Sequence, residues 1–376
     1  MKKHLLFQII LSSVIATVLL SLWSLGVKKK FEDFGLGEGT SAFYAKRDNG
    51  YPLDVDFLDV TTTDSMLQGW RLAGEKDVIF VLGNSQTRAI NQQKPGDANY
   101  VQLLNHEYGD GFDVLGHAFP NANLQELFLS FVHWSDHLPI KYLLLPVFMD
   151  DLRESGIKET YFSEIPRSLI ARFENDSSAI ASKIMTIIEE RSATDSINSE
   201  ALALKNTIQE QVEQDLDAYL NSQSRTWASR SQFRGDVLSK LFHLRNTVFQ
   251  IDAQSKRVII PRLRDANMQA LNRILEICEA KNIETVLYIP PIRNDVELPY
   301  IESDYAKFKQ DLSDLSKKFS VVSLTNLEGI IPGQYWGYKL APTVSREPEY
   351  DFMHFQYEGH KILFQELSNV LNQKLK

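Results

Sequence analysis

A serine and an aspartate–histidine pair are the residues whose types and positions could support catalysis. Ser85 lies in the segment VLGNSQT, directly after a run of apolar residues, and Asp351 and His354 are three positions apart near the end of the sequence. An imidazole oriented by a carboxylate can remove a proton from a serine hydroxyl, which then attacks a carbonyl carbon. Together these three residues could form a nucleophilic triad.

Each part of this pattern also has a structural interpretation. A serine after a strand often caps the N-terminus of a helix. Asp351 could likewise be a helix cap, and His354 could be a surface residue. A third interpretation, a phosphate-binding loop at Ser85, is the weakest, because the segment lacks the glycines and the lysine of a P-loop. The joint occurrence of the serine and the pair favours catalysis.

Five short apolar runs that alternate with helical patterns predict an α/β domain with a parallel sheet. The strands are expected at 77–82, 111–115, 141–148, 284–289 and 319–324. The helices are expected near 64–72, 98–108, 122–134, 266–281, 302–318 and 356–374. A flavodoxin-like strand order would place a site at the carboxyl ends of the strands, where Ser85 follows the first strand.

Three further segments are expected around this sheet. Residues 1–30 contain a long uncharged apolar run, which as a helix could cross a bilayer. We interpret it as an uncleaved anchor, since its apolar region is long for a signal peptide and no A-x-A site follows. Residues 31–76 are expected to be a stalk and lead-in. Within the main domain, 77–376, a helical insertion is expected at about 152–263.

The charges beside the apolar run do not decide its orientation, because lysines flank both of its ends. We place the main domain outside the cytoplasm, since an N-terminal apolar segment on such a domain usually serves as an export signal.

Composition excludes some classes of protein. The chain has 376 residues, 43% of them hydrophobic, and a formal net charge of −9. It is long enough for one large domain or two smaller ones. No basic stripe is visible, so nucleic-acid binding is not expected.

Cys278 is the single cysteine, which excludes an internal disulfide and a cysteine-based metal site. His133 and His137 lie four apart without an evident third ligand, so no metal site is expected.

The serine turn after the first strand and the Asp-x-x-His pair before the last helix have the arrangement found in SGNH (GDSL-like) hydrolases. The chain resembles that family over most of residues 77–375 outside the insertion. The resemblance implies a three-layer, flavodoxin-like α/β fold and a covalent mechanism without a metal or organic cofactor. Carried over by match, Ser85 is the nucleophile, His354 the general base and Asp351 the residue that orients it.

The middle blocks of the family match less well. Asn121 stands where the family usually has a glycine whose N–H helps form the oxyanion hole. The backbone N–H groups of Ser85 and Asn121 are therefore the expected oxyanion donors. An N-cap role for Asn121 is an equal alternative. Where the family often has an asparagine, this chain has Asp150 and Asp151, and neither is a donor when ionised.

Two residues near the expected site are candidates for substrate binding. Arg293 could bind an anionic group or pair with Asp295. Trp336 could stack on a sugar ring, although core packing of its loop is the favoured alternative.

An N-terminal membrane helix, a degenerate SGNH domain and a helical insertion together resemble the anchored envelope proteins of teichoic-acid D-alanylation and alginate O-acetylation. This resemblance implies a membrane-anchored, extracytoplasmic serine esterase or O-acyltransferase that acts on an ester-modified envelope glycan or polymer. It also implies a membrane-bound O-acyltransferase as partner. The alternative is an inactive SGNH-fold scaffold that binds such a glycan or partner.

Overall fold

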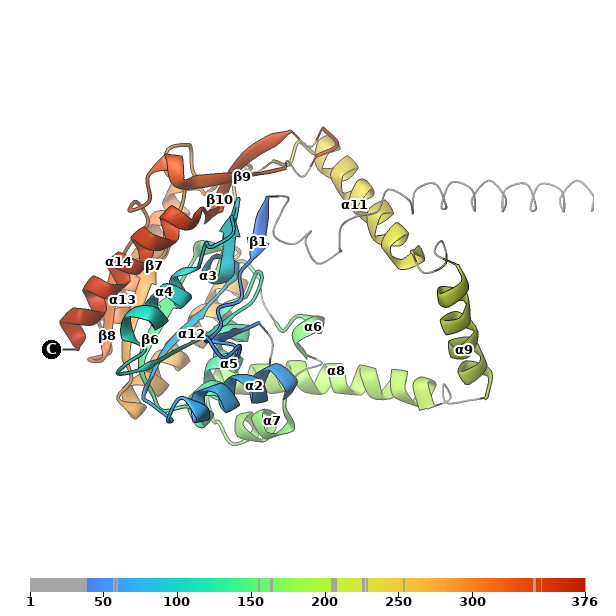
Figure 1. The fold of residues 1–376 in the computed structure, drawn as a ribbon, viewed down its shortest axis with the longest axis horizontal. Coiled ribbons are helices and arrows are strands. Elements are labelled where there is room, and N and C mark those ends of the chain that lie inside the picture. Colours follow the sequence, from blue (N-terminus) through green and yellow to red (C-terminus); the bar gives the residue numbers. More distant parts are fainter. Residues whose placement is uncertain are drawn as a thin grey trace, which may run out of the picture. The chain divides into compact units, whose positions relative to one another are not determined.

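The computed structural model describes residues 39–375 apart from 57, 59, 155, 163–164, 204–207, 225–226, 228, 253, 341–342 and 346 (Figure 1). The described residues divide into two compact units. The larger comprises those within 35–189, 253–341 and 347–376, and it contains the central sheet. The smaller comprises those within 190–252 and 342–346.

The described part of the larger unit is built on a six-stranded sheet in which all neighbouring strands are parallel. Its order is β2 (Asp54–Val55), β5 (Asp113–Ala118), β3 (Val78–Gly83), β6 (Ile140–Pro146), β7 (Glu284–Ile289) and β8 (Val322–Asn326). The five strands expected from sequence thus lie in the flavodoxin-like order 2-1-3-4-5. In such a sheet the crevice at the carboxyl ends opens between the first and third strands, here β3 and β6.

Helices cover this sheet. Across the sheet, the chain steps from β3 to β5 in one direction and from β5 on to β6, β7 and β8 in the other. Because such crossovers are right-handed, the helix between β3 and β5 lies on one face of the sheet, and the helices of the later connections lie on the other. Helix α4 packs against α14, and α5 packs against α12 (Figure 1). The bounds of the helices that connect or follow the strands are α4 (Tyr100–Tyr108), α5 (Leu124–His137), α12 (Pro261–Lys281), α13 (Glu302–Ser316) and α14 (Tyr357–Lys374).

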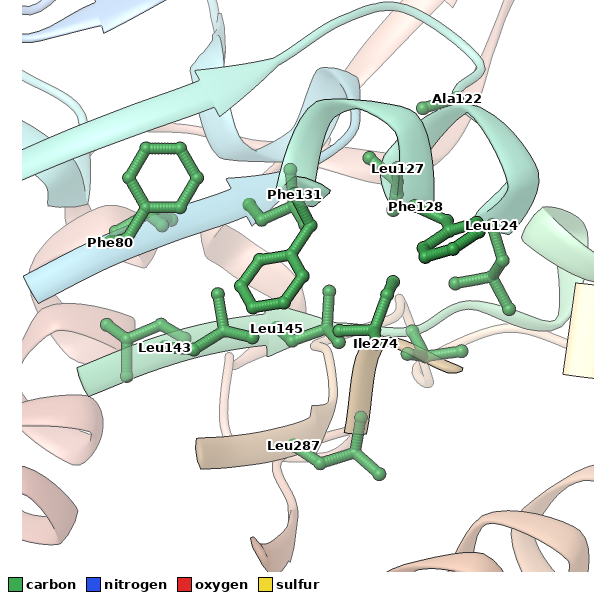
Figure 2. Close-up of a cluster of buried hydrophobic side chains, with 14 of the residues drawn as sticks. Phe80, Ala122, Leu124, Leu127, Phe128, Phe131, Leu143, Leu145, Ile274 and Leu287 are labelled. Carbon is green, nitrogen blue, oxygen red and sulfur yellow. The ribbon is translucent and has the colours of Figure 1, made fainter. Parts of the chain in front are cut away.

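A continuous apolar core fixes α5 to the sheet. Figure 2 shows Leu127, Phe128 and Phe131 of α5 above Leu143 and Leu145 of β6. All five side chains are completely buried. Burial of one such side chain contributes about 1.5–3 kcal/mol. This layer therefore gives the carboxyl ends of β3 and β6 a rigid base.

The expected stalk and lead-in at 31–76 is, from residue 39 onward, part of the folded unit, which corrects the domain boundary at 77. Strand β1 (Thr40–Ala42) pairs with β4 (Ala89–Asn91), β2 forms an edge of the sheet, and α2 spans Val60–Leu72. Sequence reasoning missed β2, because two residues carry no detectable periodicity.

The expected insertion at about 152–263 is not one unit. Helices α6 (Glu159–Phe162) and α7 (Arg167–Glu174) and the first part of α8 (Ala179–Ala203) belong with the sheet. The described residues from 190 to 252 form the second unit, with α9 (Ile208–Gln223) and α11 (Arg230–Val248). At its far end the insertion stops early, since α12 already begins at Pro261.

The membrane segment expected at 1–30 lies outside the described residues. Among the helices of the described residues, none is long and apolar enough to cross a bilayer.

A buried ion pair connects the lead-in to the segment that carries Ser85. Arg88, just after the Ser85 turn, lies 3.5 Å from the carboxylate of Asp54 and 3.1 Å from that of Asp56. The side chains of Arg88 and Asp54 are 5% and 0% exposed. The side chain of Arg88 therefore binds carboxylates of the protein itself.

Replacing Arg88 by leucine is expected to destabilise the fold by about 3–5 kcal/mol, because it leaves the Asp54 charge buried without a partner. Chemical denaturation measures the effect. The double variant Arg88→Met/Asp54→Leu removes both charges and should recover most of the loss. Lys317→Leu, which removes an exposed pair with Asp314, should have little effect on stability. A loss for Arg88→Leu as small as that of this control would contradict the prediction.

Candidate active site

Ser85 occupies a tight turn at the carboxyl end of β3. The strand ends at Gly83, and the short helix α3 spans Ser85–Arg88. The helix cap is Asn84, whose Oδ1 accepts a hydrogen bond of 3.1 Å from the N–H of Gln86. Ser85 is partly exposed, whereas both of its neighbours are buried. The interpretation of Ser85 as a helix cap is therefore wrong, and its hydroxyl remains available.

Asp351 and His354 lie in strand β10 (Pro348–Phe355), which forms an antiparallel hairpin with β9 (Trp336–Leu340). In a regular strand, residues three apart point to opposite faces. The pairing with β9 shifts register between Tyr350 and Phe355. Within this irregularity Asp351 Oδ1 accepts the backbone N–H groups of Met353 and His354, so the pair acts locally as a turn.

The structure brings the three predicted residues together. His354 Nδ1 lies 3.0 Å from Asp351 Oδ2, and His354 Nε2 lies 3.0 Å from Ser85 Oγ. Asp351 is 2% exposed. Burial alone would raise the pKa of its carboxyl, but the adjacent His354 charge and hydrogen bond outweigh burial and lower this pKa. Asp351 thus stays ionised and holds the imidazole with Nε2 toward the serine.

Two amide side chains that sequence reasoning missed hold the site together. Gln86 Nε2 donates to the carbonyl of Pro291 at 2.8 Å and to that of Met353 at 2.7 Å. Asn91 Nδ2 lies 3.3 Å from Asp351 Oδ2 and also donates to the Tyr338 carbonyl. Gln86 lies in the segment VLGNSQT together with Ser85. Its buried partners are distant in sequence, so no local pattern indicates its role.

Asn121 follows β5 in an exposed position with a φ of 52°, in the left-handed region. Its carbonyl accepts a hydrogen bond from Lys158 Nζ. The alternative that Asn121 caps α5 is wrong, because the cap is Asn123, in a capping box with Glu126. The contribution of the Asn121 N–H to an oxyanion hole stays a prediction. Ser85 opens α3, where backbone N–H groups lack intrahelical acceptors.

Arg293 and Trp336 have structural partners in place of the expected substrate. Arg293 is 3% exposed, pairs with Asp295 at 2.8 Å and donates to the Gly337 carbonyl at 2.9 Å. Trp336 is 1% exposed, and its indole N–H donates to the carbonyl of Ile331. A buried indole face cannot stack on a sugar ring. Both residues instead support the hairpin that carries the Asp–His pair.

The two aspartates after β6 have different environments. Asp150 is partly exposed and accepts hydrogen bonds from Arg153, Arg257 and Tyr300. Asp151 is 4% exposed and contacts the Ser85 turn through Asn84. Burial raises the pKa of Asp151 to about 8, although its hydrogen bonds oppose this shift. No group of three or more His, Cys, Asp or Glu side chains among the described residues is arranged to hold a metal ion.

Comparisons with known proteins do not identify what this chain does. No model of a known protein family matches the sequence, and no curated protein matches it. A solved structure assigned as an acylhydrolase, from Bacteroides fragilis, aligns with 86% of this chain and 100% of its own. The sequence identity is 9% and the TM-score is 0.39. What the chain does must therefore be inferred from its own site.

Replacing Gly83 by alanine is expected to displace the Ser85 turn. The added methyl group would lie 2.3 Å from Thr87 Oγ1 and 3.1 Å from Pro146 Cγ. Because a misplacement of about 1 Å can cost about 100-fold in rate, reactivity of Ser85 should fall more than stability does. Rates of labelling by a serine-directed probe, together with melting curves, measure both effects. Gly111→Ala, where the methyl meets nothing within 4 Å, is the control. Equal labelling of the Gly83 variant and the control would count against the prediction.

The buried groups also predict how stability depends on pH. The pKa of Asp54 is raised to about 6, and those of His117, His133 and His360 are lowered to about 3 or 4, in each case chiefly by burial. In the unfolded chain the histidines finish losing their protons about one pH unit above 6.5, their ordinary pKa, so these groups act on stability mainly below about pH 7.5. Above that pH, the folded state keeps the proton of Asp151 that the unfolded chain has lost. The free energy of unfolding should therefore fall as pH rises from about 7.5 to about 8.5.

Urea denaturation at about pH 7.5 and about pH 8.5 measures this difference. Asp151→Asn should remove most of the fall, because an amide does not titrate. Asp110→Asn, at an exposed position before β5, should retain it. The same fall in the Asp151 variant as in the parent would show that another group is responsible.

Proposed function

We propose that this chain is a serine ester hydrolase or O-acyltransferase of the SGNH type. The observation that carries the proposal is the hydrogen-bonded relay from Ser85 through His354 to Asp351, with both links at 3.0 Å. Its position at the carboxyl end of β3, where an open α/β sheet binds its ligands, supports the same conclusion.

In the first half of the reaction, the Ser85 proton passes to His354 Nε2 as Ser85 Oγ forms a bond to the ester carbonyl carbon. The electron pair of the carbonyl moves to its oxygen, and the backbone N–H groups of Ser85 and Asn121 are the proposed donors to this oxyanion. The intermediate then collapses, the bond to the leaving alkoxide breaks, and the imidazolium protonates the leaving oxygen. The acyl group remains on Ser85 as an ester.

In the second half, a hydroxyl group attacks the acyl-enzyme while His354 takes its proton. Breaking the bond to Ser85 Oγ returns that proton to the serine and restores the starting state. Water as the acceptor gives hydrolysis, and a sugar hydroxyl gives transfer. Asp351 stays ionised throughout, and its charge stabilises the imidazolium that forms twice in each cycle.

The proposed place of action is the cell envelope. The uncharged apolar run within residues 1–30 supports a membrane anchor, and an export role of that segment supports an extracytoplasmic domain. The resemblance to anchored envelope proteins supports an ester-modified glycan or polymer as substrate and a membrane-bound O-acyltransferase as partner.

A fluorophosphonate probe tests the chemistry directly. Ser85 Oγ should displace fluoride and form a bond to phosphorus, with its proton passing to His354. The full-length chain should be labelled in a 1:1 ratio, and Ser85→Ala should not be labelled. His354→Ala should react at least about 100-fold more slowly, because it removes the general base.

Ser182→Ala, which changes an exposed serine of α8, should be labelled like the parent. A folded parent that takes up no probe would replace this proposal with that of a non-catalytic scaffold. If the parent is labelled, release of acetate from a simple acetyl ester indicates hydrolysis, and labelling without acetate release indicates transfer.

A further inference from the structure

Asp151 makes two hydrogen bonds at the switch point of the sheet. It follows β6, while Ser85 follows the neighbouring strand β3. Asp151 Oδ1 accepts from Asn84 Nδ2 at 3.0 Å, and Asp151 Oδ2 accepts from the backbone N–H of Phe148 at 2.8 Å. Each oxygen of this buried carboxyl therefore has its own donor, and one donor belongs to the residue before the nucleophile.

Asn84 is held at both ends of its side chain. Its Nδ2 meets Asp151, its Oδ1 accepts from the Gln86 N–H, and its backbone carbonyl accepts from the Thr87 N–H at 3.1 Å. The side-chain amide can satisfy Gln86 only with its oxygen turned inward. The NH₂ group must then find an acceptor in a buried site, and Asp151 provides it.

We propose that Asp151 is a positioning residue, which through Asn84 fixes the Ser85 turn so that Ser85 Oγ meets His354. This assignment rests on the proposed serine chemistry. A carboxyl is required at 151 because two donors converge there, and an amide offers only one oxygen. An asparagine would turn its own NH₂ toward Asn84 or toward the Phe148 N–H. One buried donor would then lack an acceptor.

The same geometry predicts that the two side chains can be exchanged. In the double variant Asn84→Asp/Asp151→Asn, the new amide at 151 can accept from Phe148 and donate to the new carboxylate at 84. The other oxygen of that carboxylate can still accept from Gln86. Every donor and acceptor is again paired, whereas each single variant leaves a mismatch.

The experiment measures second-order rates of fluorophosphonate labelling at pH 7.5 for the full-length chain, with melting curves for every variant. Asp151→Asn and Asn84→Asp should each react at least about 10-fold more slowly than the parent, and the double variant should return to within about 3-fold. Asp110→Asn, the same substitution at an exposed site, should match the parent. Folded single variants that react at the parent's rate, or a double variant as slow as the singles, would overturn the assignment.

A second readout holds even if Asp151→Asn does not fold. In Asn84→Asp two carboxyls face each other and must share a proton. The charged groups that act on Asp151 from nearby are Asp150 and Lys158, both of which the variant keeps. The labelling rate of Asn84→Asp, divided by that of the parent, should fall as pH rises from 6 to 9. A constant ratio would refute the positioning role of Asp151. A parent without labelling would instead refute the serine chemistry itself.

Discussion

The contact between the turn after β3 and the C-terminal hairpin is the constraint on which the candidate site depends. Ser85 and His354 are 269 positions apart in the chain, and a hydrogen bond between them forms only if both segments are held rigidly. Gln86 supplies that link, because its single amide group donates to the loop after β7 and to the strand of the Asp–His pair. One side chain thereby helps to set the distance between Ser85 and His354.

The two segments rest on different supports. The turn lies at the end of β3, a central strand whose residues are fully buried, and this strand packs against β6 and α5, which share an apolar layer (Figure 2). The hairpin lies outside the central sheet, and both the apolar packing of Trp336 and Phe355 and polar contacts hold it. Arg293 binds the Gly337 carbonyl and packs against the ring of Tyr350, 4.0 Å from its centroid, and Asn91 bonds to Tyr338 and Asp351. A rigid core thus fixes Ser85, while apolar packing and buried hydrogen bonds together fix His354.

Buried charge is concentrated around the Ser85 turn. Arg88 and Asp54 form an ion pair on the lead-in side of the turn, and Asp151 closes it on the β6 side. Removing charges from water is unfavourable unless they are paired or protonated. Ionisable groups with shifted pKa values often cluster at functional sites. The buried charges beside the Ser85 turn are therefore consistent with a functional role for this turn. Burial raises the pKa of both carboxyls, that of Asp54 to about 6 and that of Asp151 to about 8.

The sequence by itself determined the sheet and the chemical groups. Buried parallel strands are continuous apolar runs, so the five main strands and the helices between them were found, and right-handed crossovers leave few orders for them. Ser85, Asp351 and His354 were found because they lie in short motifs beside those elements. Tertiary structure decided what depends on distant contacts. The two-residue edge strand β2 and the hairpin of β9 and β10 have no local periodicity. The buried side chains of Arg293 and Trp336 became structural, and Gln86 and Asp151 acquired partners, only because the fold brought distant backbone groups and side chains to them.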